Sequence, residues 1–253
     1  MDHRMRLVTV LILLYFISAL GLHPATWANT VADHSIYAEL LKKYVTNGKV
    51  DYAGFKSEEA KLGQYLKLLE AVDSKSLSQN EQFAFYANAY NAWTIELILS
   101  RYPGVKSIKD LGSLFESPWK KEIVRLDGQV MTLDNVEHDI LRPRFKDPRV
   151  HFAINCAAIS CPPLSSVPYR GDILNDQLNV STRSFLNNPD SYKLDGNDLY
   201  VSRIFKWFAQ DFNYDVLGFY LNYANDELKQ KLEAKRTALR IKYLHYDWGL
   251  NAK

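Results

Sequence analysis

Apolar residues in the first part of the chain recur three or four positions apart, which is the spacing that predicts amphipathic helices. Two such helices are predicted, one over residues 33–46 with Asp33 as its cap and one that begins at Ser57. Asn47-Gly48 follows the first helix and is typical of a helix end. The apolar faces consist of Ile36, Leu40 and Leu41 in the first helix and of Leu62, Leu66 and Leu69 in the second.

The longest predicted helix covers residues 79–101. Ser78 and Glu81 have the spacing of a capping box at its start, and Pro103-Gly104 ends the pattern. Apolar side chains occur on most sides of this segment. We therefore expect the helix to be central and buried.

Turn and strand patterns become frequent in the second half of the chain. Two hairpins are predicted, around Asp127-Gly128 and around residues 195–197, because short β-patterned runs flank turn residues at both places. Further predicted elements are a short helix from Asp134 to Pro143, a strand over residues 149–155, helices near residues 172–186, 216–224 and 226–234, and a last strand over residues 241–246. This order predicts an α+β fold in a single compact domain over residues 29–253. Its N-terminal half is rich in helices around a long central helix, and its C-terminal half contains β-hairpins and a mixed sheet.

The composition narrows the class of protein. The chain of 253 residues is 47% hydrophobic and 13% aromatic, with a formal net charge of +2. An apolar fraction of this size and a small net charge exclude an intrinsically disordered chain. Near-neutral charge also argues against nucleic acid as a partner, because there is no excess of basic residues to neutralise phosphates.

The first 28 residues have the pattern of a secretory signal peptide. Arg4 and Arg6 precede an apolar run over residues 7–22, and Thr26 and Ala28 have the small side chains of a cleavage site. The run is shorter than the roughly 20 residues that span a bilayer. We therefore expect cleavage after Ala28, export to the periplasm or the extracellular space, and no stable membrane insertion after cleavage. The alternative is an uncleaved signal anchor.

The segment over residues 147–163 holds the densest set of reactive side chains, including both cysteines of the chain. Cys156 follows the predicted strand over residues 149–155, at a point where a helical turn could begin. The positive end of a helix lowers the pKa of a thiol, and a nearby imidazole lowers it further. Cys156 is therefore the candidate nucleophile of a catalytic site.

The candidate catalytic set contains this thiol, two possible bases, an orienting carboxylate and an amide that could donate to an oxyanion. In that order, the residues are Cys156, His151 and His138, Glu137, and Asn155. Asp134 is an alternative to Glu137 as the orienting group. We expect no cofactor and no metal, because the spacing of Cys156 and Cys161 is loose for structural zinc and no clear second pair of ligands follows.

Two other roles for the cysteines remain open. Cys156 could be an inert buried thiol, since free cysteines are among the most buried residue types. Cys156 and Cys161 could also form a disulfide in an exported protein. A continuous helix would separate them by about 7.5 Å along its axis, which is too far for a disulfide, so the bond requires a loop between them.

Four residues are candidates for substrate binding: the cation Arg149, the aromatic Trp207, and the amides Asn88 and Asn91 on the long apolar helix. Buried amides cost free energy unless they are hydrogen-bonded. The preferred interpretation of the two asparagines is therefore a structural network that ties the helix to a neighbouring loop.

Five short stretches of the chain, in the expected order and spread over residues 36–251, resemble the DUF547 family. They are Asn88-Ala89-Tyr90-Asn91, Leu133-Asp134-Asn135-Val136-Glu137-His138, Arg149-Val150-His151-Phe152 through Asn155-Cys156 to Ser160-Cys161-Pro162-Pro163, Lys206-Trp207-Phe208 with Asp211-Phe212, and Tyr246-Asp247-Trp248 with Leu250-Asn251. The resemblance implies no particular activity. It also implies intracellular relatives that carry both cysteines, which favours a role other than a disulfide.

Two hypotheses follow. The first is a cysteine-dependent hydrolase or acyltransferase that acts on a peptide or acyl substrate in the cell envelope. The second is a non-enzymatic envelope module, for binding or structure, in which Cys156 and Cys161 form a structural disulfide.

Overall fold

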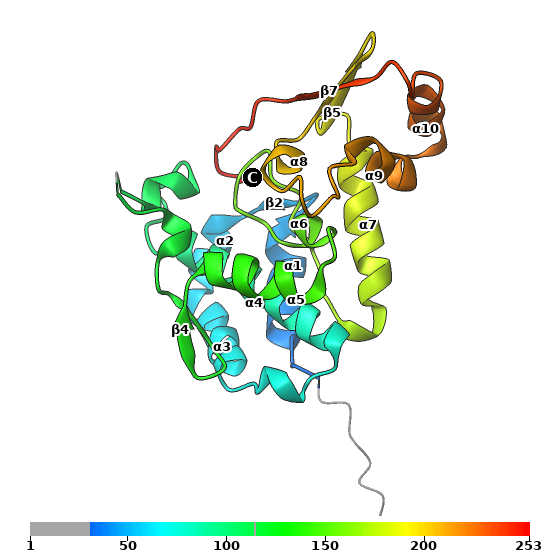
Figure 1. Cartoon of the computed structure of the whole chain (residues 1–253). Helices are drawn as coiled ribbons and strands as arrows, with labels where there is room; N and C mark the ends of the chain where they lie inside the picture. The colour runs from blue at the N-terminus through cyan, green and yellow to red at the C-terminus, as the bar shows by residue number, and fades with distance from the viewer. Residues whose placement is uncertain (1–30, 114) are drawn as a thin grey trace, which may run out of the picture.

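The computed structural model describes residues 31–113 and 115–253 (Figure 1). The signal peptide predicted over residues 1–28 lies outside the described residues. Within the part that is described, no helix is both long enough and apolar enough to cross a membrane.

Three helices precede the long helix α4; the second and third pack against α4, and the first packs against those two. The three helices are α1 (Ser35–Tyr44), α2 (Tyr52–Ser57) and α3 (Glu59–Glu70). The prediction that Ser57 caps the second helix is wrong. Asp51 caps α2 by accepting a hydrogen bond from the Gly54 amide, and α3 begins only after Glu58.

The central helix α4 (Gln79–Leu99) confirms the prediction of a long buried helix, since most of its residues are buried. The Ser78 side chain accepts a hydrogen bond from the Glu81 amide, as in half of a capping box. The Glu81 carboxylate instead accepts from the amide of Gly171, 90 residues further along the chain. One end of α4 is therefore fixed to the segment that leads into α7 (Leu174–Leu186).

The strands form two separate hairpins and one mixed sheet. The hairpin around Asp127-Gly128 and the mixed sheet confirm the prediction for the second half of the chain, whereas Asn47-Gly48, predicted as a helix end, forms the turn of a hairpin that was not predicted. The hairpins are β1 (Val45–Thr46) with β2 (Lys49–Val50) and β3 (Val124–Leu126) with β4 (Gln129–Met131). In the sheet, β6 (Asp198–Val201) is antiparallel to β5 (Tyr192–Asp195) and parallel to β7 (Arg240–Tyr243).

Short helical elements connect these parts. The α-helices are α5 (Arg142–Phe145), α6 (Val150–Ala153), α8 (Ile204–Trp207), α9 (Val216–Tyr223) and α10 (Asp226–Glu233). A π-helix, η4 (Asn135–Leu141), precedes α5, and single 3-10 turns lie at Ser74–Ser76, Ile108–Leu111, Pro118–Lys120 and Gly171–Ile173. Figure 1 shows the β5–β7 sheet and α10 at the opposite end of the molecule from α3.

Two apolar cores lie on either side of the segment over residues 150–164. The first core surrounds α4, and the second lies among α7, α8, α9 and β6. The segment contributes to both, with Ile154 in the first core and Phe152 in the second. The C-terminal residues pack against it, because Leu250 bridges to Ala158 and Ala252 bridges to Val50.

The strand predicted over residues 149–155 is wrong. Residues Val150–Ala153 form the single helical turn α6, because Asp147 accepts the amides of Arg149 and Val150 and starts the turn. A short run of alternating residues does not distinguish a strand from one turn of helix. Arg149, His151 and Asn155 consequently do not form a row on one face.

The helical turn predicted after Cys156 is also wrong. Ala157 has a left-handed backbone conformation with φ of 59°, and residues 157–159 form no helix. The thiol of Cys156 therefore gains nothing from a helix dipole.

Candidate functional site

Cys156 borders a cavity of about 180 Å³ between the two apolar cores. Polar and aromatic side chains both line it. The polar members are Asp134, Glu137, His138, His151, Cys156 and Cys161, and the aromatic members are Tyr90, Trp119, Trp207, Phe208, Tyr246 and Trp248.

The loop that carries Cys156 is held from behind by Asn155. Its side-chain oxygen accepts the Ala157 amide at 2.9 Å, and its side-chain nitrogen donates to the Pro162 carbonyl at 2.7 Å. The amide of Asn155 itself donates to Asn91 on α4. One buried asparagine therefore closes the loop over residues 156–162 and fastens it to the central helix.

The sulfur of Cys156 has several polar neighbours. The hydroxyl of Tyr246 lies 3.3 Å from it, and the sulfur of Cys161 accepts the Cys156 amide at 2.8 Å. Burial alone would raise the pKa of the Cys156 thiol, but hydrogen bonds from Cys161, Tyr246 and the Ala158 amide lower it. Burial raises the pKa of Cys161, as does the neighbouring Cys156 sulfur. Of the two thiols, Cys156 is therefore the one that ionises more readily.

Glu137 is the buried acid of the cavity. It projects from the π-helix η4, and π-helices are frequent at functional sites. Burial raises the pKa of its carboxyl to about 7, although Arg142 and the Tyr90 hydroxyl act in the opposite direction. Glu137 can therefore both accept and release a proton near neutral pH.

His151 is fixed by a carboxylate and an aromatic ring. Its Nε2 lies 2.7 Å from Asp211, and its ring stacks on Phe208 at a centroid distance of 4.1 Å. Arg142 also binds Asp211 through two nitrogens, at 2.6 and 3.0 Å. Burial would raise the pKa of Asp211, but these hydrogen bonds hold it well below its ordinary value. Asp211 is therefore ionised and accepts a hydrogen bond from the Nε2–H of His151.

The other ring nitrogen of His151 faces Glu137. The distance from Nδ1 to the Glu137 carboxylate oxygen is 4.0 Å, longer than a hydrogen bond. Burial lowers the pKa of His151, while Asp211 raises it. A neutral His151 therefore turns a lone pair toward Glu137, which favours the protonated form of that acid.

His138 is less suited to act as a base. Its Nδ1 accepts a hydrogen bond from Arg142 at 3.0 Å, so the proton of the neutral ring lies on Nε2. Burial lowers its pKa further. The lone pair that a base needs is thus already occupied by a guanidinium group.

Aromatic rings line much of the cavity and contact one another. Trp248 has ring contacts with Trp119 at 5.6 Å, with Trp207 at 5.7 Å and with Tyr246 at 4.6 Å. Trp207 is 43% exposed and so marks the open side of the cavity. The Lys109 ammonium lies over the Trp248 ring, 4.0 Å from the ring centroid.

Four of the five predicted catalytic residues line this one cavity. They are Cys156, Glu137, His138 and His151, whereas Asn155 is buried behind the loop. The candidate substrate-binding residue Trp207 also lines the cavity.

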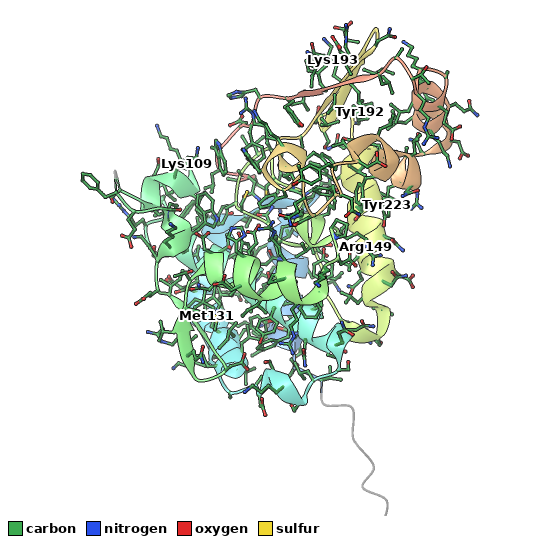
Figure 2. All side chains as sticks on the ribbon, in the orientation of Figure 1. Lys109, Met131, Arg149, Tyr192, Lys193 and Tyr223 are labelled. Atoms are coloured by element: carbon green, nitrogen blue, oxygen red, sulfur yellow. The ribbon has the colours of Figure 1, made fainter. Side chains whose placement is uncertain are left out.

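The other candidate binding residues lie elsewhere. Asn88 exchanges hydrogen bonds with the backbone of Tyr169, and Asn91 with Ala153 and Asn155, which confirms the structural network predicted for these amides. Arg149, seen beside α7 in Figure 2, pairs with Asp147 and with side chains of α7. None of the three residues lines the cavity.

Three polar residues of the site were not predicted from the sequence. Asp211 and Arg142 form the charged pair beside His151, and Tyr246 contacts the thiol. Asp211 and Tyr246 do occur in stretches that resemble DUF547, as does the cysteine segment. That shared resemblance was the sequence feature that could have indicated a place for both residues at the site.

Cys156 and Cys161 are free thiols in the structure, so the disulfide considered as an alternative is not formed. Among residues 31–113 and 115–253, no group of three or more His, Cys, Asp or Glu side chains is placed to hold a metal ion.

Comparison with known proteins agrees with the resemblance. Residues 74–186 match the family model described as "Protein of unknown function, DUF547". No curated protein and no solved structure matches the chain. The matched region includes Glu137, His151 and both cysteines, whereas Asp211 and Tyr246 lie beyond it.

Proposed function

We propose that this protein, a member of the DUF547 family, is a cysteine-dependent hydrolase or acyltransferase that acts on a peptide or acyl substrate. The observation that carries the proposal is the position of the Cys156 sulfur, which shares one small cavity with the Tyr246 hydroxyl and the Glu137 carboxyl. A stabilised thiolate and an acid with a pKa near 7 are the two groups that acyl transfer requires.

The reaction proceeds in two steps. The Cys156 thiolate attacks the carbonyl carbon of the substrate, a C–S bond forms, and the bond to the leaving amine or alcohol breaks. Glu137 gives its proton to that leaving group. Water or an acceptor nucleophile then attacks the thioester and passes its proton to Glu137, and the Cys156 thiolate is released.

Glu137 is a better proton carrier than either histidine. The Nδ1 lone pair of His138 accepts a hydrogen bond from Arg142 and so is not available to a substrate. The Nε2 of His151 is hydrogen-bonded to Asp211 and points away from Glu137. We assign His151 and Asp211 a positioning role, in which they set the protonation of Glu137. Burial keeps the pKa of Glu137 at about 7, so both of its protonation states are populated at neutral pH.

The cavity suits a small or flat acyl group. Its volume is about 180 Å³, and Trp119, Trp207 and Trp248 supply an apolar wall. Rings and short aliphatic chains bind well against such walls.

We also propose that the protein acts outside the cytoplasm, in the periplasm or the extracellular space. This part of the proposal is supported by the basic and apolar pattern of residues 1–28. Its test is N-terminal sequencing of the exported protein, with Asn29 expected as the first residue. Detection of the uncut chain in the cytoplasm alone would contradict it.

A second candidate function is ligand binding without turnover. The exposed face of Trp207 beside Trp248 favours it, because stacked aromatic rings bind peptides and sugars without any need for a nucleophile. In this case Cys156 has no role in binding chemistry.

The two functions are separated by trapping an acyl-enzyme. The full chain is incubated with a panel of activated esters and amides that carry short aliphatic or aromatic acyl groups, and the adduct is located by mass spectrometry. We expect acylation of Cys156 in the wild type, no adduct in Cys156→Ser, and slow turnover in Glu137→Gln. Glu70→Gln, at an exposed position on α3, is the matched control and should behave as the wild type. Hydrolysis that persists unchanged in Cys156→Ser would overturn the proposal.

A further inference from the structure

The two cysteines lie face to face across one tight turn. The Cys161 sulfur is 2.8 Å from the Cys156 amide nitrogen, and the Cys161 amide donates to the Ala158 carbonyl. Since N–Cα is about 1.46 Å, the Cys161 sulfur lies within roughly 4.3 Å of the Cys156 Cα. The left-handed Ala157 and the bonds of Asn155 to Ala157 and Pro162 hold the turn in this shape.

The surroundings of the two sulfurs differ. Cys156 is partly exposed and borders the open cavity, so small molecules can reach it. Cys161 is only 9% exposed and packs into the second apolar core, although it borders the same cavity. Cys156 is therefore the more accessible of the two sulfurs to a reagent from solvent.

We propose that Cys156 is an oxidation site for hydroperoxides and that Cys161 captures the product as a reversible disulfide. In the first step the Cys156 thiolate attacks an oxygen of the hydroperoxide, the O–O bond breaks, and water or an alcohol leaves after protonation. Cys156 is thereby oxidised to a sulfenic acid. In the second step the Cys161 sulfur attacks the Cys156 sulfur, the S–O bond breaks, and the hydroxyl group leaves as water with the thiol proton of Cys161.

This assignment explains why two free thiols occupy one loop next to a hydroxyl donor. A lone cysteine of this kind is open to irreversible oxidation, whereas a neighbouring thiol converts the sulfenic acid into a form that a dithiol can reduce. The disulfide would also remove the nucleophile of the proposed hydrolase. That consequence rests on the proposed function, but the oxidation chemistry does not.

The reaction can be followed in one tryptic peptide, because residues 150–170 contain both cysteines and no internal Lys or Arg. The full chain is treated with one equivalent of hydrogen peroxide in the presence or absence of dimedone, which traps sulfenic acids. We expect the wild-type peptide to become lighter by two hydrogens, to carry little dimedone, and to regain its mass after dithiothreitol. Cys161→Ser should instead accumulate a dimedone adduct on Cys156.

A serine at position 161 can still accept the Cys156 amide, so this variant preserves the contact that holds the loop. Thermal unfolding of Cys161→Ser checks that the fold is intact, and thiol counts of the unfolded wild type before and after peroxide provide a second measurement. Equal dimedone labelling of Cys156 in wild type and variant would overturn the proposal, and so would two thiols that stay free after peroxide. None of these measurements depends on hydrolase activity. A negative result would therefore overturn the oxidation proposal without bearing on the proposed hydrolase function.

Discussion

The hydroxyl of Tyr246 lies 3.3 Å from the sulfur of Cys156, although 90 positions separate the two residues. The C-terminal segment that carries Tyr246 is fixed to the cysteine loop by three backbone hydrogen bonds. The amides of Ile159 and Ser160 donate to the carbonyls of Gly249 and Asp247, and the amide of Asn251 donates to the carbonyl of Ala157. This segment lies outside the region that matches the family model, yet it completes the surroundings of the thiol. The state of Cys156 is therefore controlled by a contact between distant parts of the chain.

Removal of the Tyr246 hydroxyl tests whether this contact lowers the pKa of the Cys156 thiol. Tyr246→Phe should raise the pH midpoint for alkylation of Cys156 by iodoacetamide, because the thiolate loses a hydrogen-bond donor. Hydrogen bonds to charged groups contribute about 1.5–3 kcal/mol, so a shift of about one to two pH units is expected. Tyr243→Phe is the matched control, since Tyr243 is exposed on β7, and its midpoint should equal that of the wild type. An unchanged midpoint in Tyr246→Phe would remove Tyr246 from the site.

Because the Glu137 carboxyl is buried, we expect the free energy of unfolding to fall as the pH rises. Its folded pKa is raised from 4.5 to about 7, so the folded state prefers the protonated acid. The stabilisation is complete below pH 4.5 and is lost as the pH rises through 7, with a total on the order of 3 kcal/mol. Glu137→Gln carries no charge at either pH. Its free energy of unfolding should therefore fall less between pH 5 and pH 8 than that of the wild type.

Urea unfolding at pH 5 and pH 8 measures this difference. Glu70→Gln, at the exposed end of α3, should retain the pH dependence of the wild type. Equal pH dependence in the wild type and in Glu137→Gln would mean that the buried carboxyl is not protonated in the folded state.

The sequence predicts the elements of this fold better than it predicts the site. Periodicity and caps are local, so the long helix α4, the turns at Asp127-Gly128 and residues 195–197, and the α+β class were all predicted correctly. The cysteine segment is determined by distant partners instead. Asn91 on α4 holds Asn155, and the resulting turn replaces the helical turn expected after Cys156. The predicted strand is replaced by the helical turn α6, which Asp147 starts locally.

The same reason explains the mixed outcome for the site residues. Reactive residue types in one segment correctly suggested that Cys156 and His151 lie together, and both line the cavity. The hydrogen-bond partners of the His151 ring nitrogens and of the Cys156 sulfur could not be predicted, because they include Asp211 and Tyr246, which lie far along the chain. A pattern of residue types carries no information about which nitrogen of His151 is already bonded.

Asn91→Ala should destabilise the protein without a direct effect on the cavity. The substitution leaves the Ala153 carbonyl and the Asn155 amide buried without partners, and each unpaired group costs about 1–3 kcal/mol. Chemical denaturation should show a loss of about 2–6 kcal/mol in total. Asn222→Ala, on the exposed side of α9, should change stability by less than about 0.5 kcal/mol. Similar values for the two variants would mean that the Asn91 network adds nothing to stability.

Two glycines in similar turns test how the cysteine loop is supported. Gly48 and Gly128 have φ of 76° and 72°, and each follows a residue with positive φ in a two-residue hairpin turn. An alanine at either position pays about 1–2 kcal/mol for the left-handed conformation. A Cβ at Gly128 meets nothing within 4 Å, whereas at Gly48 it would lie 2.2 Å from the Cβ of Pro163. Gly48→Ala must therefore also displace the end of the cysteine loop, at a further cost of about 1–3 kcal/mol.

Displacement of Pro163 in Gly48→Ala should change the pKa of the Cys156 thiol as well as the free energy of unfolding. Pro163 follows Pro162, whose carbonyl accepts the side chain of Asn155, so movement there loosens the turn that brings Cys161 to Cys156. We expect Gly48→Ala to raise the pH midpoint for alkylation of Cys156 and Gly128→Ala to leave it unchanged. If both variants lose the same stability and keep the wild-type midpoint, the β1–β2 turn does not support the loop, and the pKa of Cys156 is set by Tyr246 and Cys161 alone.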